Sequence, residues 1–291
     1  MLPYFIRKKN KNTLPIWVVK NSNLKIWLKD KPEHFSNWLS SNNFKNKVGN
    51  SILIPDLQAN IAGLLVVVPK KISIWSLAEI PNRIQDKEFY IDSEINMEEE
   101  KKLVVGWGLG TYLFSVYKKN NKNYSSLFVS KKVDWVQAKR EIEAVFFSRN
   151  LINLPANDLG PDEFETTVRD LCEKYKAGLT VISGNKLLKS FPAIYTVGNA
   201  SSRRPRLINF RWGKNTAPKL VLIGKSVCFD SGGLDIKSSI GMRKMKKDMG
   251  GGAIVLGLAK MIMDSGMNID LRVLLPTVEN VIGENAYKPG D

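Results

Sequence analysis

The sequence contains very little histidine and cysteine. Its one histidine is His34, so a zinc site built from several histidines is excluded. Its two cysteines, Cys172 and Cys228, lie far apart and form no Cys-x-x-Cys pair, which indicates reduced thiols in a reducing compartment. Any bound metal ion must therefore be held by carboxylates, with lysine as the remaining nitrogen donor.

Long apolar runs are also missing. No segment approaches the roughly 18 to 20 apolar residues of a membrane-spanning helix. The first twelve residues, MLPYFIRKKNKN, place positive charge after a very short apolar patch, which is the reverse of a secretory signal. We therefore expect a cytoplasmic protein with no membrane partner. Its 291 residues are long enough to bury a sizeable core and to form two domains.

Acidic residues are few compared with basic ones. The chain has 28 Asp and Glu against 44 Lys and Arg, a formal net charge of +16, which would attract polyanions without sequence preference. The lysines at 8–12, 118–123 and 131–132 are interleaved mostly with asparagine rather than with aromatic stacking residues. We favour solvated loops over a nucleic-acid-binding patch, and keep the second interpretation as an alternative.

The amino-terminal part has the pattern of a small α/β domain, assigned to residues 1–128. Apolar runs predict strands over 15–19, 50–54 and 63–68, and either a strand or the entry to a helix over 72–77. Polar segments between them carry aromatic residues at spacings that suit helices packed on a sheet. No catalytic constellation occurs in this domain.

A helix is predicted from Asn96 to about Lys118. Asn96 with Glu99 three residues later forms a capping-box signal. Gly106, Gly108 and Gly110 would each weaken this helix by roughly 1 kcal/mol relative to alanine, so close packing against a neighbour is their expected purpose.

The polar segment 117–132 marks the predicted domain boundary, and residues 129–291 form the predicted catalytic domain. A linking helix is expected over 133–153 and another from Pro161, with Cys172 as a small core residue on its buried face. Strands are then expected over four ranges that alternate with helices: 179–182, 206–212, 219–224 and 269–275. This alternation predicts an α/β fold with a mostly parallel, mixed sheet covered by helices.

The stretch 219–252 concentrates the residues that can carry chemistry. Lys219–Gly224 reads as a strand buried on both faces, which places Lys225 at its carboxyl end, where open α/β sheets bind ligands. A loop over 228–234 holds Asp230 before two glycines that let the backbone approach an ion closely. Asp248 precedes a glycine cluster and a helix expected over 248–263.

Asp230 and Asp248 are candidate ligands of divalent metal ions, which prefer deprotonated oxygen donors. Lys225 can join them only as a neutral amine, which a nearby cation and a desolvated site would favour. The structural alternative is that Asp230 caps a turn, Asp248 caps the following helix and the lysines are solvated. The residues alone leave both interpretations open.

Several motifs together resemble the leucyl (cytosol) aminopeptidase family of dinuclear metallopeptidases. The resemblance covers nearly the whole chain, most specifically after residue 150, and one departure from the family pattern is Ser226 in place of glycine. The motifs are Gly106–Tyr112 (GWGLGTY), Asn153–Asp158 (NLPAND) with Gly160-Pro161, Phe191–Ile194 (FPAI) with Val197-Gly198, Gly224-Lys225, Phe229–Leu234 (FDSGGL), Ile236-Lys237, Lys247–Gly250 (KDMG) and Tyr287–Asp291 (YKPGD).

This resemblance implies a hydrolase that removes amino-terminal, leucine-type residues from peptides. It implies Lys225, Asp230 and Asp248 as ligands of two divalent ions, Mn²⁺ or Zn²⁺, with Asp230 bridging them. Lys237 would be the catalytic lysine, whose ammonium stabilises the developing oxyanion. A homohexamer is also implied.

The family's Asn-Thr-Asp-Ala-Glu-Gly-Arg motif, which completes the metal site, does not occur in the sequence. We therefore expect a chain truncated before that motif, with a catalytic domain incomplete at its carboxyl terminus and inactive alone. Two other functions are kept as alternatives: nucleic-acid binding, and a non-catalytic scaffold derived from the family.

Overall fold

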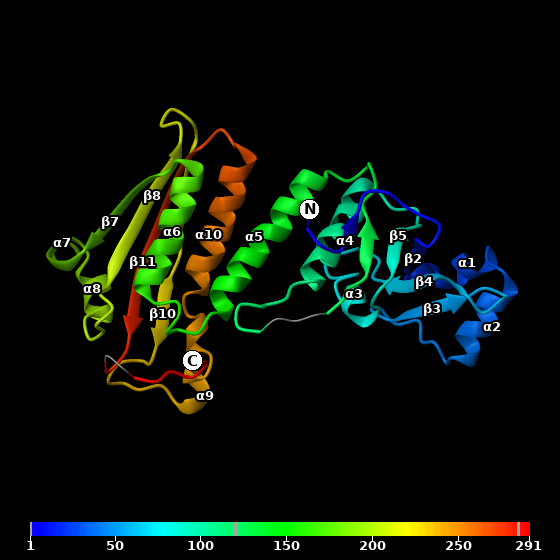
Figure 1. Ribbon diagram of the computed structural model, residues 1–291, viewed down its shortest axis with the longest axis horizontal. Helices are drawn as coiled ribbons and strands as arrows, with labels where there is room; N and C mark the ends of the chain where they lie inside the picture. The colour runs from blue at the N-terminus through cyan, green and yellow to red at the C-terminus, as the bar shows by residue number, and fades with distance from the viewer. Residues whose placement is uncertain (1, 119–121, 284–285) are drawn as a thin grey trace. The chain divides into compact units, whose positions relative to one another are not determined.

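The computed structural model describes residues 2–118, 122–283 and 286–291. The chain forms two compact units, Met1–Ile142 and Glu143–Asp291, each with its own sheet (Figure 1). The units divide inside helix α5 (Trp135–Asn153), whereas the sequence placed the domain boundary between residues 128 and 129, ahead of that helix. The first turns of α5 belong to unit 1 because Ile142 is fully buried and lies against Gly108.

The sheet of unit 1 has six strands in the order β1-β6-β5-β2-β4-β3. Every pairing is parallel except that of β3 with β4. The strands are β1 (Phe5–Ile6), β2 (Leu14–Lys20), β3 (Ser51–Pro55), β4 (Ile61–Val68), β5 (Glu88–Ile91) and β6 (Ser126–Phe128). The prediction identified β2, β3 and β4 but missed β1, β5 and β6, which are too short to show a period. Residues 72–77 contain turns rather than a strand or a helix entry, so that prediction was wrong.

The helices of unit 1 are α1 (Leu24–Lys29), α2 (Glu33–Ser41), α3 (Ile80–Arg83) and α4 (Met97–Gly110). An aromatic cluster forms part of the core where α1 and α2 meet the sheet. The ring of Trp17 on β2 lies 5.2 Å from that of Phe35 and 5.7 Å from that of Trp27, between ring centroids. These contacts confirm the expected packing of small helices on a small sheet.

Helix α4 begins as predicted. The Asn96 side chain accepts a hydrogen bond from the Glu99 N–H, and the Glu99 side chain accepts one from the Asn96 N–H. The glycines allow close packing, because a Cβ on Gly106 would lie 1.7 Å from the carbonyl oxygen of Ile74. The helix ends at Gly110, short of the predicted Lys118. Thr111 is its C-cap, and the Thr111 hydroxyl donates to the Gly108 carbonyl.

The sheet of unit 2 has five strands, and its pairing is mixed, as expected. β11 pairs in parallel with β9 and β10 and antiparallel with β8, which pairs antiparallel with β7. The strands are β7 (Gly178–Ser183), β8 (Arg206–Gly213), β9 (Lys219–Ile223), β10 (Ser226–Asp230) and β11 (Asp270–Asn280). The helices are α6 (Pro161–Tyr175), α7 (Gly184–Ser190), α8 (Pro192–Gly198), α9 (Ser239–Met242) and α10 (Gly250–Ser265).

The core of unit 2 lies between the sheet and the helices α6 and α10, which run alongside the strands in Figure 1. Phe164 of α6, Leu256 of α10 and Phe210 of β8 are fully buried there. The predicted burial of β9 on both faces was wrong. Its residues alternate between half-buried and exposed, and Ile223 is 68% exposed in the described structure.

The described helices include none that is both long enough and apolar enough to cross a membrane.

Candidate metal and catalytic site

Lys225 lies in a break between two strands on one edge of the central strand β11. β9 pairs with Asp270–Leu274 of β11, and β10 then pairs in parallel with its last residues, up to Asn280. The sequence predicted a loop over 228–234, but residues 228–230 belong to β10, because they continue the ladder along β11 beyond the break. Asp230 therefore ends a strand instead of sitting within a loop.

The glycine cluster at the start of α10 packs against this break. The Gly252 N–H donates to the Lys225 carbonyl at 2.7 Å, and a Cβ on Gly224 would lie 2.8 Å from the Gly252 Cα. A side chain at either glycine would push α10 away from the sheet. Ser226, the departure from the family pattern, is fully buried, and its hydroxyl donates to the Gly224 carbonyl.

Asp230 and Lys237 form an ion pair across the loop that follows β10. Lys237 Nζ lies 3.1 Å from Asp230 Oδ2, and the Gly232 N–H and the Asn280 amide both donate to Asp230 Oδ1. Burial raises the pKa of Asp230, but these hydrogen bonds and the Lys237 ammonium outweigh it and hold the pKa below its ordinary value. Asp230 is therefore an anionic carboxylate that could ligate a cation, but its Oδ1 already accepts two hydrogen bonds from the protein.

Asp248 and Lys225 form a second lysine–carboxylate pair. Lys225 Nζ lies 2.9 Å from Asp248 Oδ2, a buried oxygen that accepts no well-aligned hydrogen bond from the described residues. The alternative that Asp248 caps α10 was wrong, since the helix begins at Gly250 with Met249 at its N-cap. The alternative that Asp230 caps a turn holds, through its bond to Gly232.

These residues fit a cation site only in part. A buried carboxylate oxygen without a well-aligned hydrogen bond, next to an amine that could become a nitrogen donor, matches the chemistry of a divalent-ion ligand set. Within residues 2–118, 122–283 and 286–291, however, no three His, Cys, Asp or Glu side chains are grouped to hold a metal ion. The two lysines instead neutralise the two carboxylates.

Asn280 is a site residue that sequence reasoning missed. Its side-chain amide donates to Asp230 Oδ1 at 2.8 Å, and its main-chain carbonyl accepts from the Ser231 N–H at 2.8 Å. The contact joins residues 50 positions apart, and it depends on the register that pairs Asp230 with Asn280 across β10 and β11. The strand was predicted only over 269–275, so Asn280 lay beyond its predicted end, and nothing in the sequence identified its partner.

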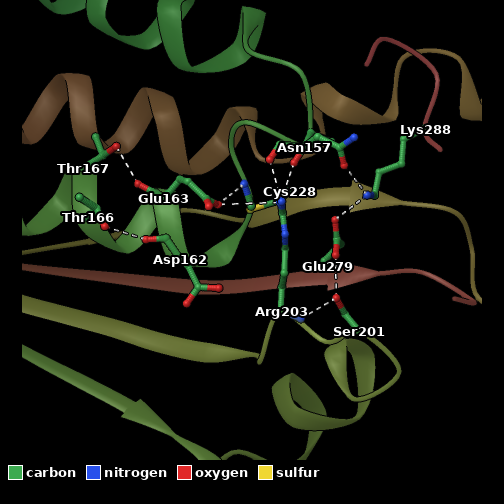
Figure 2. Close-up of polar contacts among 12 residues, drawn as sticks. Asn157, Asp162, Glu163, Thr166, Thr167, Ser201, Arg203, Cys228, Glu279 and Lys288 are labelled. Carbon is green, nitrogen blue, oxygen red and sulfur yellow. Dashed lines mark hydrogen bonds and ion pairs between the residues drawn. The ribbon is translucent and has the colours of Figure 1, made fainter. Parts of the chain in front are cut away.

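A buried polar network is built around Glu279, the residue directly before Asn280 on β11. Figure 2 shows its members. Glu279 and Lys288 have side chains 1% and 5% exposed, with Lys288 Nζ at 3.3 Å from Glu279 Oε1. Ser201 donates to Glu279 Oε2 at 2.6 Å, and Lys288 Nζ also donates to Asn157 Oδ1 at 3.1 Å. Figure 2 shows Lys288 directed toward both Asn157 and Glu279. The network joins β11, the segment before α6 and the segment after β11.

Arg203 makes further contacts with the segment before α6. Its guanidinium donates to the carbonyl oxygens of Ala156 and Asn157, at 2.9 and 2.7 Å. Lys246, two residues before Asp248, donates to the Asn153 carbonyl at 2.9 Å. The family-like motif at 153–158 therefore supplies backbone acceptors to Arg203 and to Lys246, and Lys246 lies on the connector leading to Asp248.

Two family profiles match the chain. Residues 146–291 match the catalytic domain of the cytosol aminopeptidase family, and residues 14–130 match the N-terminal domain of M17 aminopeptidases. A probable cytosol aminopeptidase of Corynebacterium glutamicum is 33% identical over 199 residues, covering 65% of this chain and 40% of that protein. One of Cenarchaeum symbiosum is 38% identical over 150 residues, covering 50% of this chain and 31% of that protein.

Solved structures show the same similarity. The cytosol aminopeptidase of Coxiella burnetii superposes with a TM-score of 0.87 and 36% identity, covering 99% of this chain and 63% of that one. The leucine aminopeptidase of Caenorhabditis elegans, with a TM-score of 0.72 and 24% identity over 99% of this chain and 63% of that one, shares the fold. The chain spans about two fifths of the length of the first curated relatives it matches. Since both of its parts match one family in order, the chain belongs to the cytosol aminopeptidase family.

Proposed function

We propose that the chain contributes the site of a divalent-metal-dependent aminopeptidase that hydrolyses amino-terminal, leucine-type residues from peptides. The observation that carries this proposal is the pair of lysine–carboxylate contacts, Lys225 with Asp248 and Lys237 with Asp230, at positions that match the family motif. Membership of the cytosol aminopeptidase family supports the peptidase chemistry. It does not favour nucleic-acid binding or a scaffold role as the main function.

Each residue has a role that its chemistry allows. Asp230 and Asp248 would hold divalent ions, with Lys225 as a neutral nitrogen ligand and Asp230 shared between two ions. A bound divalent ion would supply Lewis-acid chemistry, acidifying water and polarising a peptide carbonyl. The Lys237 ammonium, 3.1 Å from Asp230, would stabilise negative charge that develops on the substrate carbonyl oxygen.

The donor count limits what residues 1–291 can hold by themselves. Divalent ions of this kind take about six donors, and the described site offers two carboxylates and one amine. Both carboxylates already have ammonium partners, so an ion must displace or deprotonate a lysine. We expect at most one weakly bound ion per 291-residue chain and negligible turnover.

Calorimetric titration of the 291-residue protein with MnCl2 or ZnCl2, after extensive dialysis against chelator, tests the metal site. Asp248→Asn should abolish the binding, whereas Asp170→Asn, an exposed carboxylate on α6, should leave it unchanged. Two tightly retained ions per chain with turnover would contradict the donor count.

The activity itself is tested in a fusion of the chain to the part of the Coxiella burnetii relative that lies beyond the region matched here. We expect manganese- or zinc-dependent hydrolysis of a leucine anilide that is lost in Lys237→Met. A folded, metal-loaded fusion without activity would refute the proposed function.

Family membership also supports two further proposals about the protein's setting. We propose that it acts in the cytoplasm, as the name of its family and relatives suggests. We also propose that it assembles as a homohexamer, which light scattering of the purified protein would test.

A further inference from the structure

The sheet of unit 1 has a topological switch point at its centre. From β2 the chain passes to β3 and β4 on one side, where β4 pairs with β2, and then to β5, which pairs with the other edge of β2. All these pairings with β2 are parallel. In open α/β sheets, ligands bind outside the carboxyl ends of the strands at such a point, because the connecting segments diverge there and leave a crevice.

A cavity of about 720 Å³ lies at this place. It is lined by the last residues of β2, by the segment Asp92–Ile95 directly after β5, by α1 and the residues after it, and by Lys132. Its volume falls within the roughly 300 to 1,000 Å³ of ordinary small-molecule sites. Topology and cavity are independent observations, and both point to the β2 and β5 strand ends.

One wall of this cavity is held in place by backbone and side-chain hydrogen bonds. The Ser93 hydroxyl accepts from the Val18 N–H at 2.7 Å and donates to the Asp92 carbonyl at 2.8 Å. Lys20, at the end of β2, pairs with Glu99 at 3.1 Å. The segment after β5 is therefore fixed to β2, and the cavity is formed before any ligand binds.

The lining has a defined chemistry. Trp27 and Ile26 provide an apolar side, and Ile26 is 62% exposed. Asp30 and Lys31 also line the cavity, and Lys31 Nζ lies 5.2 Å from the centroid of the Trp27 ring. Lys132, Asp92 and Glu94 have no ion-pair partner within the part of the chain that the structure describes. The cavity thus offers apolar contact together with exposed charges of both signs that form no ion pair among the described residues.

The same lining argues against a nucleoside diphosphate as the ligand. Close approach of a pyrophosphate requires glycines in the turn after a strand. β2 is followed by Asn21–Asn23 and β5 by Asp92–Glu94, and neither segment contains glycine.

We propose that this cavity is a binding site for a small zwitterion with an apolar side chain, namely a free amino acid or a short peptide. Its ammonium group would face Asp92 and Glu94, its carboxylate would face Lys132, and its side chain would contact Ile26 and Trp27. The site lies entirely within unit 1 and uses none of the residues of the candidate metal site.

Calorimetric titration of the metal-free 291-residue protein with L-leucine and with the dipeptide Leu-Leu tests this proposal, and the two probes distinguish the two sources of ligand. Asp92→Asn and Lys132→Gln should each weaken binding by about tenfold, since each removes a charge-assisted contact. The matched controls Asp170→Asn and Lys70→Gln remove the same charges elsewhere and should leave the affinity unchanged.

If neither probe binds at millimolar concentration, in protein whose folding is confirmed by circular dichroism, the proposed site is refuted. Binding that persists unchanged in both variants would place the zwitterion elsewhere and also overturn it. Binding of AMP in place of both probes, lost in the same variants, would overturn the ligand class. Because no metal is present, these outcomes are separate from the test of the peptidase.

Discussion

The two sheets differ in how the charges at their strand ends are balanced. In unit 2, Lys225 pairs with Asp248, Lys237 with Asp230 and Lys288 with Glu279. In unit 1, Asp92 and Lys132 line a cavity without an ion-pair partner among the described residues. A site whose charges are already paired must give up a contact to bind an ion. A site with unpaired charges gains contacts when a complementary ligand arrives.

Thiol labelling separates the two units most sharply, because both cysteines lie in unit 2. Burial raises the pKa of Cys172 to about 11, and Cys228 is fully buried with its pKa also raised. We expect labelling by a disulfide reagent at pH 8 to be at least about a thousandfold slower in the native protein than in urea, given ordinary domain stability.

The same shift has a defined sign against pH. The folded-state pKa of Cys172 lies above its unfolded value of about 8.5, so the neutral thiol is favoured in the native state. Its contribution to stability is complete below pH 8.5 and is lost as pH rises toward 11. The labelling prediction would be contradicted by rapid reaction of the native protein at pH 8, which would show that unit 2 opens readily and exposes its thiols.

Removing one charge of the buried pair should have the largest effect on stability. Lys288→Met leaves Glu279, 1% exposed, without its cation, which costs about 3 to 5 kcal/mol in the unfolding of unit 2. Urea denaturation followed by thiol exposure measures this change. Lys132→Met in unit 1 is the control, because its partnerless, exposed ammonium should change stability by less than about 0.5 kcal/mol. Equal effects of the two substitutions would remove the contrast between the units.

Asn280→Ala should weaken divalent-ion binding to unit 2 by about tenfold, because the Asn280 amide orients the Asp230 carboxylate. The readout is calorimetric titration with MnCl2, accompanied by the urea midpoint. Asn209→Ala, on β8 of the same sheet, removes an amide that contacts only Arg272 among the described polar groups and should leave metal affinity unchanged. A similar loss in both variants would mean that the effect comes from the sheet rather than from Asp230.

The smallest expected effect concerns unit 1. Asn96→Ala removes the side-chain cap of α4 and should destabilise unit 1 by about 1 kcal/mol. Tryptophan fluorescence during urea unfolding would measure it, with no change in thiol exposure. A coupled shift in both signals would show that the two units unfold together.

Much of the fold could be predicted from local patterns. Long apolar strands such as β4, the capping box of α4 and the buried face of α6 follow from periodicity and from hydrogen bonding between near neighbours. Strands β1, β5 and β6 could not be predicted, because two to four residues show no period and are stabilised only by partners distant in sequence. The end of α4 was also misplaced, since the cap at Thr111 competes with a helical pattern that continues beyond it.

For the site, the sequence by itself determined which residues could carry chemistry. One histidine and two separated cysteines left carboxylates and lysines as donors, and the resemblance to the family motifs pointed to Lys225, Asp230, Lys237 and Asp248. Only the tertiary structure decided their pairing: which lysine meets which carboxylate, that Asn280 holds Asp230, and that a charged cavity opens at the ends of β2 and β5. The reason is physical. Residue type and local spacing are encoded along the chain, whereas strand register and crossover topology bring distant residues within hydrogen-bonding distance.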